Sequence, residues 1–227
     1  MQQLVLDIAP APAPTLDNFV PGSNAELVQL LRQVIAGTAE ERCIYLWGAA
    51  HSGRTHLLQA VARAQRASGR ATLYCACSQG GIAIPAATGL DCAVFDDVQH
   101  LDEQAQIELF ALFNGMRESG GVLLASGNAP PPALALRADL VTRLSWGLVY
   151  QLYGLDDVDR SEALKRHAEQ RGLALAQPVI DYLLRHERRD LATLIAVVDA
   201  LDRYSLQTMR PITVPMLREL LRAHSPG

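Results

Sequence analysis

Hydrophobic residues in the first two thirds of the chain gather in short continuous runs, and the stretches between them have a helical spacing. The runs are rich in β-branched and aromatic side chains, which is typical of buried strands. They lie at 43–47, 71–77, 92–97, 121–126 and 146–152, and helical spacing covers 24–36, 57–67 and 104–119. Strands that are apolar throughout and alternate with helices predict an α/β fold, with a parallel sheet covered by helices on both faces.

The pattern changes after Leu155, where strand signals stop. Amphipathic helical segments follow at 157–172, 179–186 and 189–206, and Pro215 opens a last helix that we expect to end at Ala223. We therefore predict three parts: a tail and proline spacer at 1–14, an α/β domain at 15–154, and a small all-helical domain at 155–227. No internal repeat indicates a solenoid.

Composition excludes several classes of protein. With 49% hydrophobic and 19% charged residues, the chain is expected to be globular and not disordered. Its formal charge of -4 argues against strong unspecific binding to nucleic acid. No signal peptide or apolar stretch of membrane-spanning length is evident, so no membrane partner is expected and we predict a cytoplasmic protein. The four cysteines are expected to be reduced core thiols.

The segment from Gly48 to Thr55 has the spacing of a phosphate-binding loop, with Arg54 where that motif has lysine. It lies between a predicted strand and a predicted helix, as such a loop requires. Its glycines permit a tight turn with inward N–H groups, and Thr55 would reach a magnesium ion. The alternative is a glycine-rich turn without a ligand. Because a guanidinium is a planar fork and not a compact point charge, we expect nucleotide binding without fast hydrolysis.

Polar residues follow the later predicted strands. Asp96 and Asp97 end one strand, where the first carboxylate would hold magnesium and the second would orient water; an acidic pair at a helix start is the alternative. Asn128 follows the next strand, as a contact to a γ-phosphate or as a turn residue before three prolines. Arg143 lies late in the α/β region, either as an arginine directed at a neighbouring chain's phosphate or as a solvated surface residue.

Five segments, in this order and spacing, resemble the replication initiator DnaA, an AAA+ ATPase. They are LDNFVPGSN (16–24), GAAHSGRTHLL (48–58), FDDVQ (95–99), LASGN (124–128) and DLVTRLSWG (139–147). The resemblance spans roughly residues 16 to 223, and the sequence stops where DnaA continues into a helix-turn-helix DNA-binding domain. A shortened DnaA-related protein with a glutamine-leucine tail is similar to the Hda family, which acts in the regulatory inactivation of DnaA.

The resemblance implies an AAA+ P-loop base followed by a helical lid, with ADP or ATP and Mg²⁺ as cofactors. It implies an adenine pocket, a phosphate loop, a magnesium site, a water-orienting carboxylate, a first sensor and an arginine finger acting in trans. The corresponding residues are Phe19, Val20, Gly22 and Asn24 for adenine; Gly48, His51, Ser52, Gly53, Arg54, Thr55 and His56 for the phosphates; Thr55 and Asp96 for Mg²⁺; and Asp97, Asn128 and Arg143. The family's second sensor, an arginine, aligns with Ala192, and Arg189, about one helical turn earlier, is only a candidate for that role.

The tail resembles the short peptide with which replication proteins dock on the bacterial sliding clamp. Its side chains Gln3, Leu4, Leu6 and Ile8 would enter a pocket, while an extended backbone lies on the clamp. An N-terminal edge strand is the alternative.

The resemblance thus implies a regulator that docks on the DNA-loaded clamp (β subunit), contacts DNA only through it, and stimulates ATP hydrolysis by DnaA. Its own ATP hydrolysis is expected to be weak, and a homo-oligomer is possible. The alternatives are an autonomous AAA+ ATPase such as a helicase loader, and a plain DNA-binding module, which the acidic balance disfavours.

Overall fold

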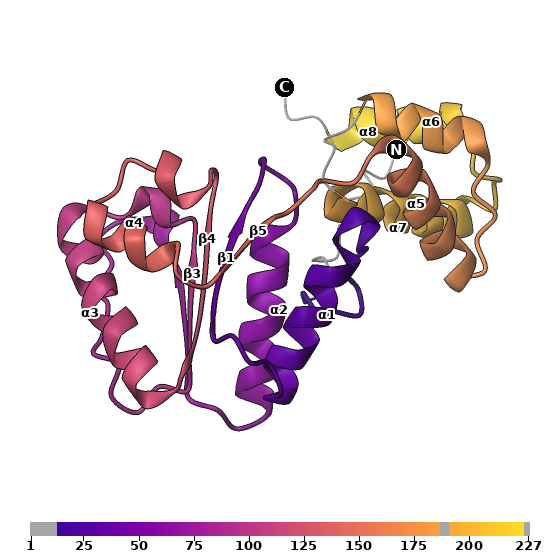
Figure 1. Cartoon of the computed structure of the whole chain (residues 1–227). Coiled ribbons are helices and arrows are strands. Elements are labelled where there is room, and N and C mark those ends of the chain that lie inside the picture. Colours follow the sequence, from indigo (N-terminus) through magenta and orange to yellow (C-terminus); the bar gives the residue numbers. More distant parts are fainter. Residues whose placement is uncertain (1–12, 187–190, 225–227) are drawn as a thin grey trace. The chain divides into compact units, whose positions relative to one another are not determined.

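Five parallel strands form one sheet that lies between two pairs of helices (Figure 1). The computed structural model describes residues 13–186 and 191–224. The elements of the α/β part are α1 (Ala25–Ala36), β1 (Cys43–Trp47), α2 (Arg54–Ala67), β2 (Thr72–Ala76), β3 (Cys92–Asp96), α3 (Glu103–Ser119), β4 (Val122–Gly127), α4 (Ala138–Leu144) and β5 (Leu148–Gln151), with 3₁₀ turns at Gly22–Asn24, Cys77–Gln79, Val98–His100 and Pro131–Ala133.

The strand order β2-β3-β4-β1-β5 determines which loops meet. Trp47 of β1 pairs with Gly127 of β4, and Phe95 of β3 pairs with Ala125 of β4. Because all pairs are parallel, the carboxyl ends of β1, β3 and β4 lie side by side at one edge of the sheet. The segments that follow these three strands are therefore neighbours, although they are far apart in the sequence.

Alternate residues of each strand pack on opposite faces of the sheet, as the pleat requires. In β1, Ile44 and Leu46 join the apolar cluster formed with α1 and α2, whereas Tyr45 joins the cluster formed with α3 and α4. All three side chains are fully buried. The uninterrupted apolar runs of the sequence thus reflect a sheet that is covered on both faces, as predicted.

Two predicted strands are shorter than expected, and one helix was not expected. The run at 71–77 leaves the sheet at Cys77, where a 3₁₀ turn begins. The run at 146–152 begins only at Leu148, because the N–H groups of Ser145 and Trp146 bond back to Val141 and Arg143 and complete the end of α4. α4 has only seven residues, too few for a visible helical period in the sequence.

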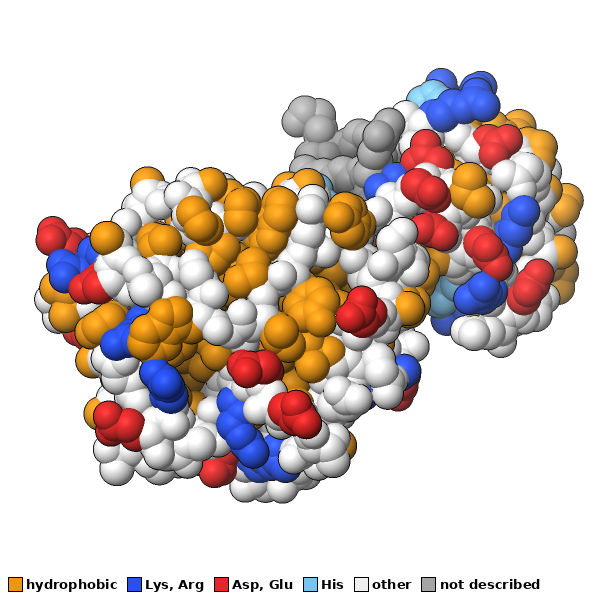
Figure 2. Space-filling view, viewed as in Figure 1, with side chains coloured by type: hydrophobic (Ala, Val, Ile, Leu, Met, Phe, Trp, Pro, Cys, Tyr) orange, Lys and Arg blue, Asp and Glu red, His pale blue; other side chains and the backbone are white. Residues whose placement is uncertain are grey.

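Helices alone form the second part of the chain: α5 (Asp157–Gln170), α6 (Gln177–His186), α7 (Leu191–Thr208) and α8 (Val214–His224). The chain divides into two compact units, Ala13–Gly154, here called the base, and the helical unit that begins at Leu155. The helical unit has its own apolar core, which includes Leu164, Ile180 and Val198. Charged side chains of both signs are spread over its viewed surface, among apolar and other groups (Figure 2).

None of the helices in the described part of the chain has the length and apolar character that a bilayer crossing needs. The four cysteines are free thiols; Cys75, Cys77 and Cys92 are buried and Cys43 is half-buried. This agrees with the prediction of reduced thiols in the core.

Candidate functional site

The turn between β1 and α2 is a tight loop that only glycine fits at two positions. A Cβ on Gly48 would collide with the carbonyl oxygen of Leu152. Gly53 has a φ of +101°, and a Cβ there would lie 2.7 Å from the ring of Phe19. His51 also has a positive φ, of 63°, which is unusual for a residue with a side chain. The loop thus has a compact, strained backbone, as the predicted phosphate-binding turn requires.

Arg54, the first residue of α2, turns its guanidinium back into this loop. Nη1 donates to the carbonyl oxygens of Gly48 and Ala49, the latter at 2.8 Å. Nη2 donates to Oδ1 of Asp97 at 2.8 Å, and the two side chains are only 11% and 26% exposed. The ion pair joins the β1–α2 loop to the end of β3, as the register of the strands allows.

Asp96 is buried, and each of its carboxylate oxygens accepts a hydrogen bond from a hydroxyl group. Ser126 donates to Oδ1 at 2.6 Å and Tyr74 donates to Oδ2 at 3.0 Å. Burial, together with the neighbouring Asp96 carboxylate, raises the pKa of Tyr74 well above its usual value, so the phenol keeps its proton. Asp96, the last residue of β3, thereby joins this strand to β2 and β4.

The two carboxylates predicted to lie at the Mg²⁺ site both have protein partners in this structure. Asp96 is engaged by two hydroxyl groups, Asp97 is paired with Arg54, and Thr55 is exposed on the first turn of α2. In the described ranges, no group of three or more His, Cys, Asp or Glu side chains is placed to hold a metal ion. At phosphate sites Mg²⁺ is held by one or two carboxylates together with water and phosphate oxygens, and here both candidate carboxylates have protein partners.

Two polar atoms of the loop have no hydrogen-bond partner. They are Ser52 Oγ and Arg54 Nε, and they are the only buried side-chain nitrogen or oxygen atoms without one in the part of the chain that the structure describes. A buried polar atom without a partner costs about 1–3 kcal/mol of stability. A ligand that forms hydrogen bonds with these two atoms would offset this cost.

The predicted adenine side of the site is built around Phe19. Its ring lies against Gly53 and packs at a tilt on His56, with ring centroids 5.5 Å apart. The His56 ring bonds through Nε2 to the carbonyl oxygen of Thr15 at 2.9 Å. Val20 is half-buried next to Phe19, and Gly22 is exposed. Phe19 therefore joins the segment before α1 to the phosphate loop.

Both polar groups of the Asn24 side-chain amide form hydrogen bonds with the protein backbone. Its Nδ2 donates to the carbonyl oxygens of Pro21 and Tyr153, and its Oδ1 accepts from the N–H of Tyr153 at 2.9 Å. Its amide thus ties the start of α1 to the last residues of the base.

Asn128 follows β4 at the same edge of the sheet as the phosphate loop. Its side chain is exposed, and its backbone N–H donates to Oε1 of Gln99 at 3.3 Å. Because Trp47 pairs with Gly127, Asn128 comes after β4 just as Gly48 comes after β1. This is the position that the sequence predicted for a phosphate sensor.

Arg143 lies near the amino end of β1, whereas the phosphate loop follows the carboxyl end of this strand. Its guanidinium stacks on the ring of Trp146, 3.8 Å from the centroid, and lies 5.2 Å from the centroid of Phe110. Gly147, the next residue after Trp146, approaches the carbonyl oxygen of Cys43 at the amino end of β1. Arg143 is therefore not placed to contact a phosphate in its own loop.

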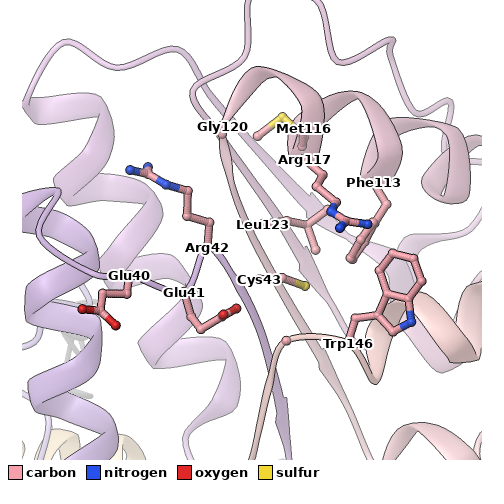
Figure 3. Close-up of a pocket in the computed structure, with 12 residues that line it drawn as sticks. Glu40, Glu41, Arg42, Cys43, Phe113, Met116, Arg117, Gly120, Leu123 and Trp146 are labelled. Carbon is pink, nitrogen blue, oxygen red and sulfur yellow. The ribbon is translucent and has the colours of Figure 1, made fainter.

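Trp146 also borders a cavity of about 390 Å³ at this end of β1 (Figure 3). Arg117 extends toward the same indole and lies 4.8 Å from the ring centroid. Cys43 lines the cavity, and burial, assisted by Glu41, raises the pKa of its thiol to about 12. A thiol with this pKa is protonated at neutral pH and does not act as a nucleophile.

Some predicted residues lie outside the part of the chain that the structure describes. These are the tail residues Gln3, Leu4, Leu6 and Ile8 and the second-sensor candidate Arg189. They stay predictions from the sequence.

Sequence reasoning missed four residues of this region: Tyr74, Ser126, Trp146 and Arg117. Tyr74 and Ser126 reach Asp96 only because β2 and β4 flank β3, and no pattern in the sequence gives that strand order. Trp146 carried a usable signal, because a tryptophan three residues after an arginine can stack on it.

Two family models match separate parts of the chain. Residues 86–151 match the bacterial DnaA ATPase domain, and residues 157–221 match the lid domain of Hda. The first match includes β3 to β5 with Asp96, Asp97, Asn128 and Arg143, and the second includes most of the helical unit.

Solved structures show the same fold. Domain III of the Thermotoga maritima replication initiation protein DnaA has a TM-score of 0.74 at 23% identity, covering 94% of this chain and 98% of that one. AMPPCP-bound DnaA from Aquifex aeolicus has a TM-score of 0.71 at 25% identity, covering 83% of this chain and 65% of that one. The present chain thus spans less than two thirds of the Aquifex protein's length.

A Thermotoga maritima RuvB variant shares the fold more distantly, with a TM-score of 0.67 at 13% identity, covering 93% of this chain and 72% of that one. Together these likenesses confirm the predicted fold class: a parallel sheet with flanking helices, followed by an all-helical lid.

Proposed function

We propose, from the premise that the chain is a DnaA-related AAA+ protein with an Hda-type lid domain, that it is a regulator which stimulates ATP hydrolysis by DnaA. It binds adenine nucleotide in its own loop, docks on the DNA-loaded sliding clamp, and offers Arg143 to ATP held by DnaA. The product is ADP-bound initiator, which limits re-initiation of chromosome replication.

The observation that carries this proposal is the position of Arg143. Because Arg143 lies near the amino end of β1, away from the loop that follows this strand, a role in phosphoryl transfer requires a nucleotide that another chain holds. A guanidinium given in trans stabilises the charge that develops on a transferred phosphoryl group, and it is worth about 10³ to 10⁵ in rate in known cases.

Nucleotide binding by the chain itself is supported by the loop between β1 and α2. Its positive-φ backbone, the start of α2 and the unpaired Ser52 Oγ and Arg54 Nε together suit a phosphate group. Phe19 and His56 provide aromatic rings beside this loop that suit the base of ADP or ATP. Mg²⁺ has no part in this proposal, because the carboxylates that would hold it are engaged by protein groups.

Docking on the clamp rests on the tail motif with Gln3, Leu4, Leu6 and Ile8. DNA then takes part only through the clamp, which agrees with the acidic balance of the chain. An autonomous ATPase such as a helicase loader would need an open carboxylate to orient water, whereas Asp97 is paired with Arg54.

The test is a phosphate-release assay with ATP-loaded DnaA, in which this protein, ADP, clamp and DNA are each added or left out. Stimulation should require all of them and should be lost with Arg143→Ala. Stimulation without the clamp would overturn the docking proposal. Phosphate release by this protein alone, at the stimulated rate, would favour the autonomous ATPase.

A further inference from the structure

The Arg54 guanidinium occupies the interior of the phosphate loop, where its hydrogen bonds can be counted. A guanidinium has five N–H donors and no acceptor. The carbonyl oxygens of Gly48 and Ala49 take the two on Nη1, and Asp97 takes one on Nη2. The Nε–H, which has no protein partner, and the second N–H of Nη2 remain for a ligand.

The same guanidinium neutralises the carboxylate that would otherwise attract a cation. In phosphate loops that contain lysine, Mg²⁺ bridges the phosphate oxygens and is held by the loop hydroxyl and an acidic residue after a neighbouring strand. Here Asp97 already faces a positive charge at 2.8 Å, and Asp96 accepts hydrogen bonds from Ser126 and Tyr74. A divalent cation brought to this point would meet a like charge, with no carboxylate free of a protein partner.

We propose that the Arg54 guanidinium takes the place of the divalent cation, so that adenine nucleotide binds this loop without Mg²⁺. The inference rests on the proposed function, since it concerns the nucleotide of that same site. The ligand it selects is the free nucleotide polyanion, whose phosphate oxygens accept from the remaining N–H donors of Arg54. Hydrolysis is not supported, because Asp97 stays paired and cannot orient water.

Arg54→Lys is the variant that tests the exchange. An ammonium group has three donors and no planar fork, so it cannot bind the loop carbonyls, Asp97 and a phosphate at once. Asp97 is then released to attract a cation. We expect the variant to bind ADP about tenfold or more tightly with Mg²⁺ than with EDTA, the scale of one charge-assisted hydrogen bond. Arg63→Lys is the matched control, because Arg63 is exposed on the same helix.

The experiment is calorimetric titration of the full chain with ADP, in excess MgCl₂ or in EDTA. Wild type and Arg63→Lys should bind ADP no more tightly in MgCl₂ than in EDTA, because Mg²⁺ competes for the free nucleotide, and Arg54→Lys should bind more tightly in MgCl₂. Electron paramagnetic resonance with Mn²⁺ gives a second readout: only Arg54→Lys should alter the Mn²⁺–ADP spectrum.

Each other result has a definite meaning. If wild type binds ADP much more tightly with Mg²⁺, the inference is wrong while the proposed nucleotide site stands. If wild type binds no ADP in either solution, the nucleotide part of the proposed function fails and the inference with it. Asp97→Asn, whose side chain tolerates the left-handed backbone at this position (φ +62°), adds a further check: a loss of affinity confined to Mg²⁺ conditions would also overturn the inference.

Discussion

Arg143 lies with its guanidinium 3.8 Å from the centre of the Trp146 ring. Phe110 provides a second aromatic face, and no ion pair to Arg143 is found within the described residues. Aromatic faces hold a guanidinium in place without neutralising its charge. This contact agrees with the proposed role of Arg143 as a finger directed at another chain's phosphate.

Replacing Arg143 with alanine should abolish stimulation of DnaA, because the charge that acts at the partner's transition state is lost. Arg143→Lys should recover little, since lysine lacks the planar fork. Phosphate release from ATP-loaded DnaA measures the effect, and ADP binding and clamp binding of the variant should stay near wild type. Full stimulation by a folded Arg143→Ala variant would assign the finger to a different arginine.

Trp146→Ala should lower stimulation by about two- to fivefold, which corresponds to the loss of an exposed cation–π contact of about 0.5–1 kcal/mol. Trp146→Phe keeps an aromatic face and should retain most of the rate. The same assay applies, with thermal unfolding as the control for folding. If alanine and phenylalanine behave alike, the ring does not position Arg143.

Replacing Gln3 and Leu4 together with alanine should remove clamp binding and leave the melting temperature unchanged. The two residues precede a proline spacer and are expected to contribute little to the core. Fluorescence polarisation with a labelled tail peptide, competed by the full chain, measures binding. Unchanged competition by the double variant would show that the clamp contact lies elsewhere.

Gly53→Ala should weaken ADP binding and destabilise the base by about 1–3 kcal/mol, the range for a strained backbone position. The new Cβ would also press on Phe19. Gly69→Ala is the matched control: Gly69 has a φ of +77°, but no atom lies within 4 Å of the added Cβ. It should lose some stability yet bind ADP normally, as followed by calorimetry and thermal melts. Equal ADP binding by both variants would contradict the role given to the loop.

Stability should fall as the pH rises above about 9, because burial raises the pKa of the Cys43 and Cys92 thiols to about 12 from an ordinary value of 9.0. In the unfolded chain these thiols ionise first, so their contribution is complete below pH 9 and is lost as the pH rises toward 12. The slope is about 1.4 kcal/mol per pH unit for each thiol. Melts at about pH 8 and about pH 10 measure it, and a Cys43→Ala, Cys92→Ala variant should depend less on pH.

The sequence predicted the sheet well because buried parallel strands leave uninterrupted apolar runs, and the ends of those runs located Gly48, Asp96 and Asn128 at one edge. It could not predict the direction of the Arg54 side chain. A guanidinium at the first residue of α2 can point toward a bound phosphate or toward Asp97. The direction depends on the distance between β1 and β3, which lie on either side of β4. The sequence predicts Trp146 in a strand, because helix α4 before it is too short to show a helical period of apolar residues.

The two hydrogen bonds between Asn24 and the backbone of Tyr153 join residues that are 129 positions apart. They join a residue near the start of the base to a residue near its end, just before the helical unit begins at Leu155. The helical unit therefore follows a residue that is already hydrogen-bonded to the base. Such a design is modular: evolution or a protein engineer can exchange the helical unit for a different one without rebuilding the sheet of the base.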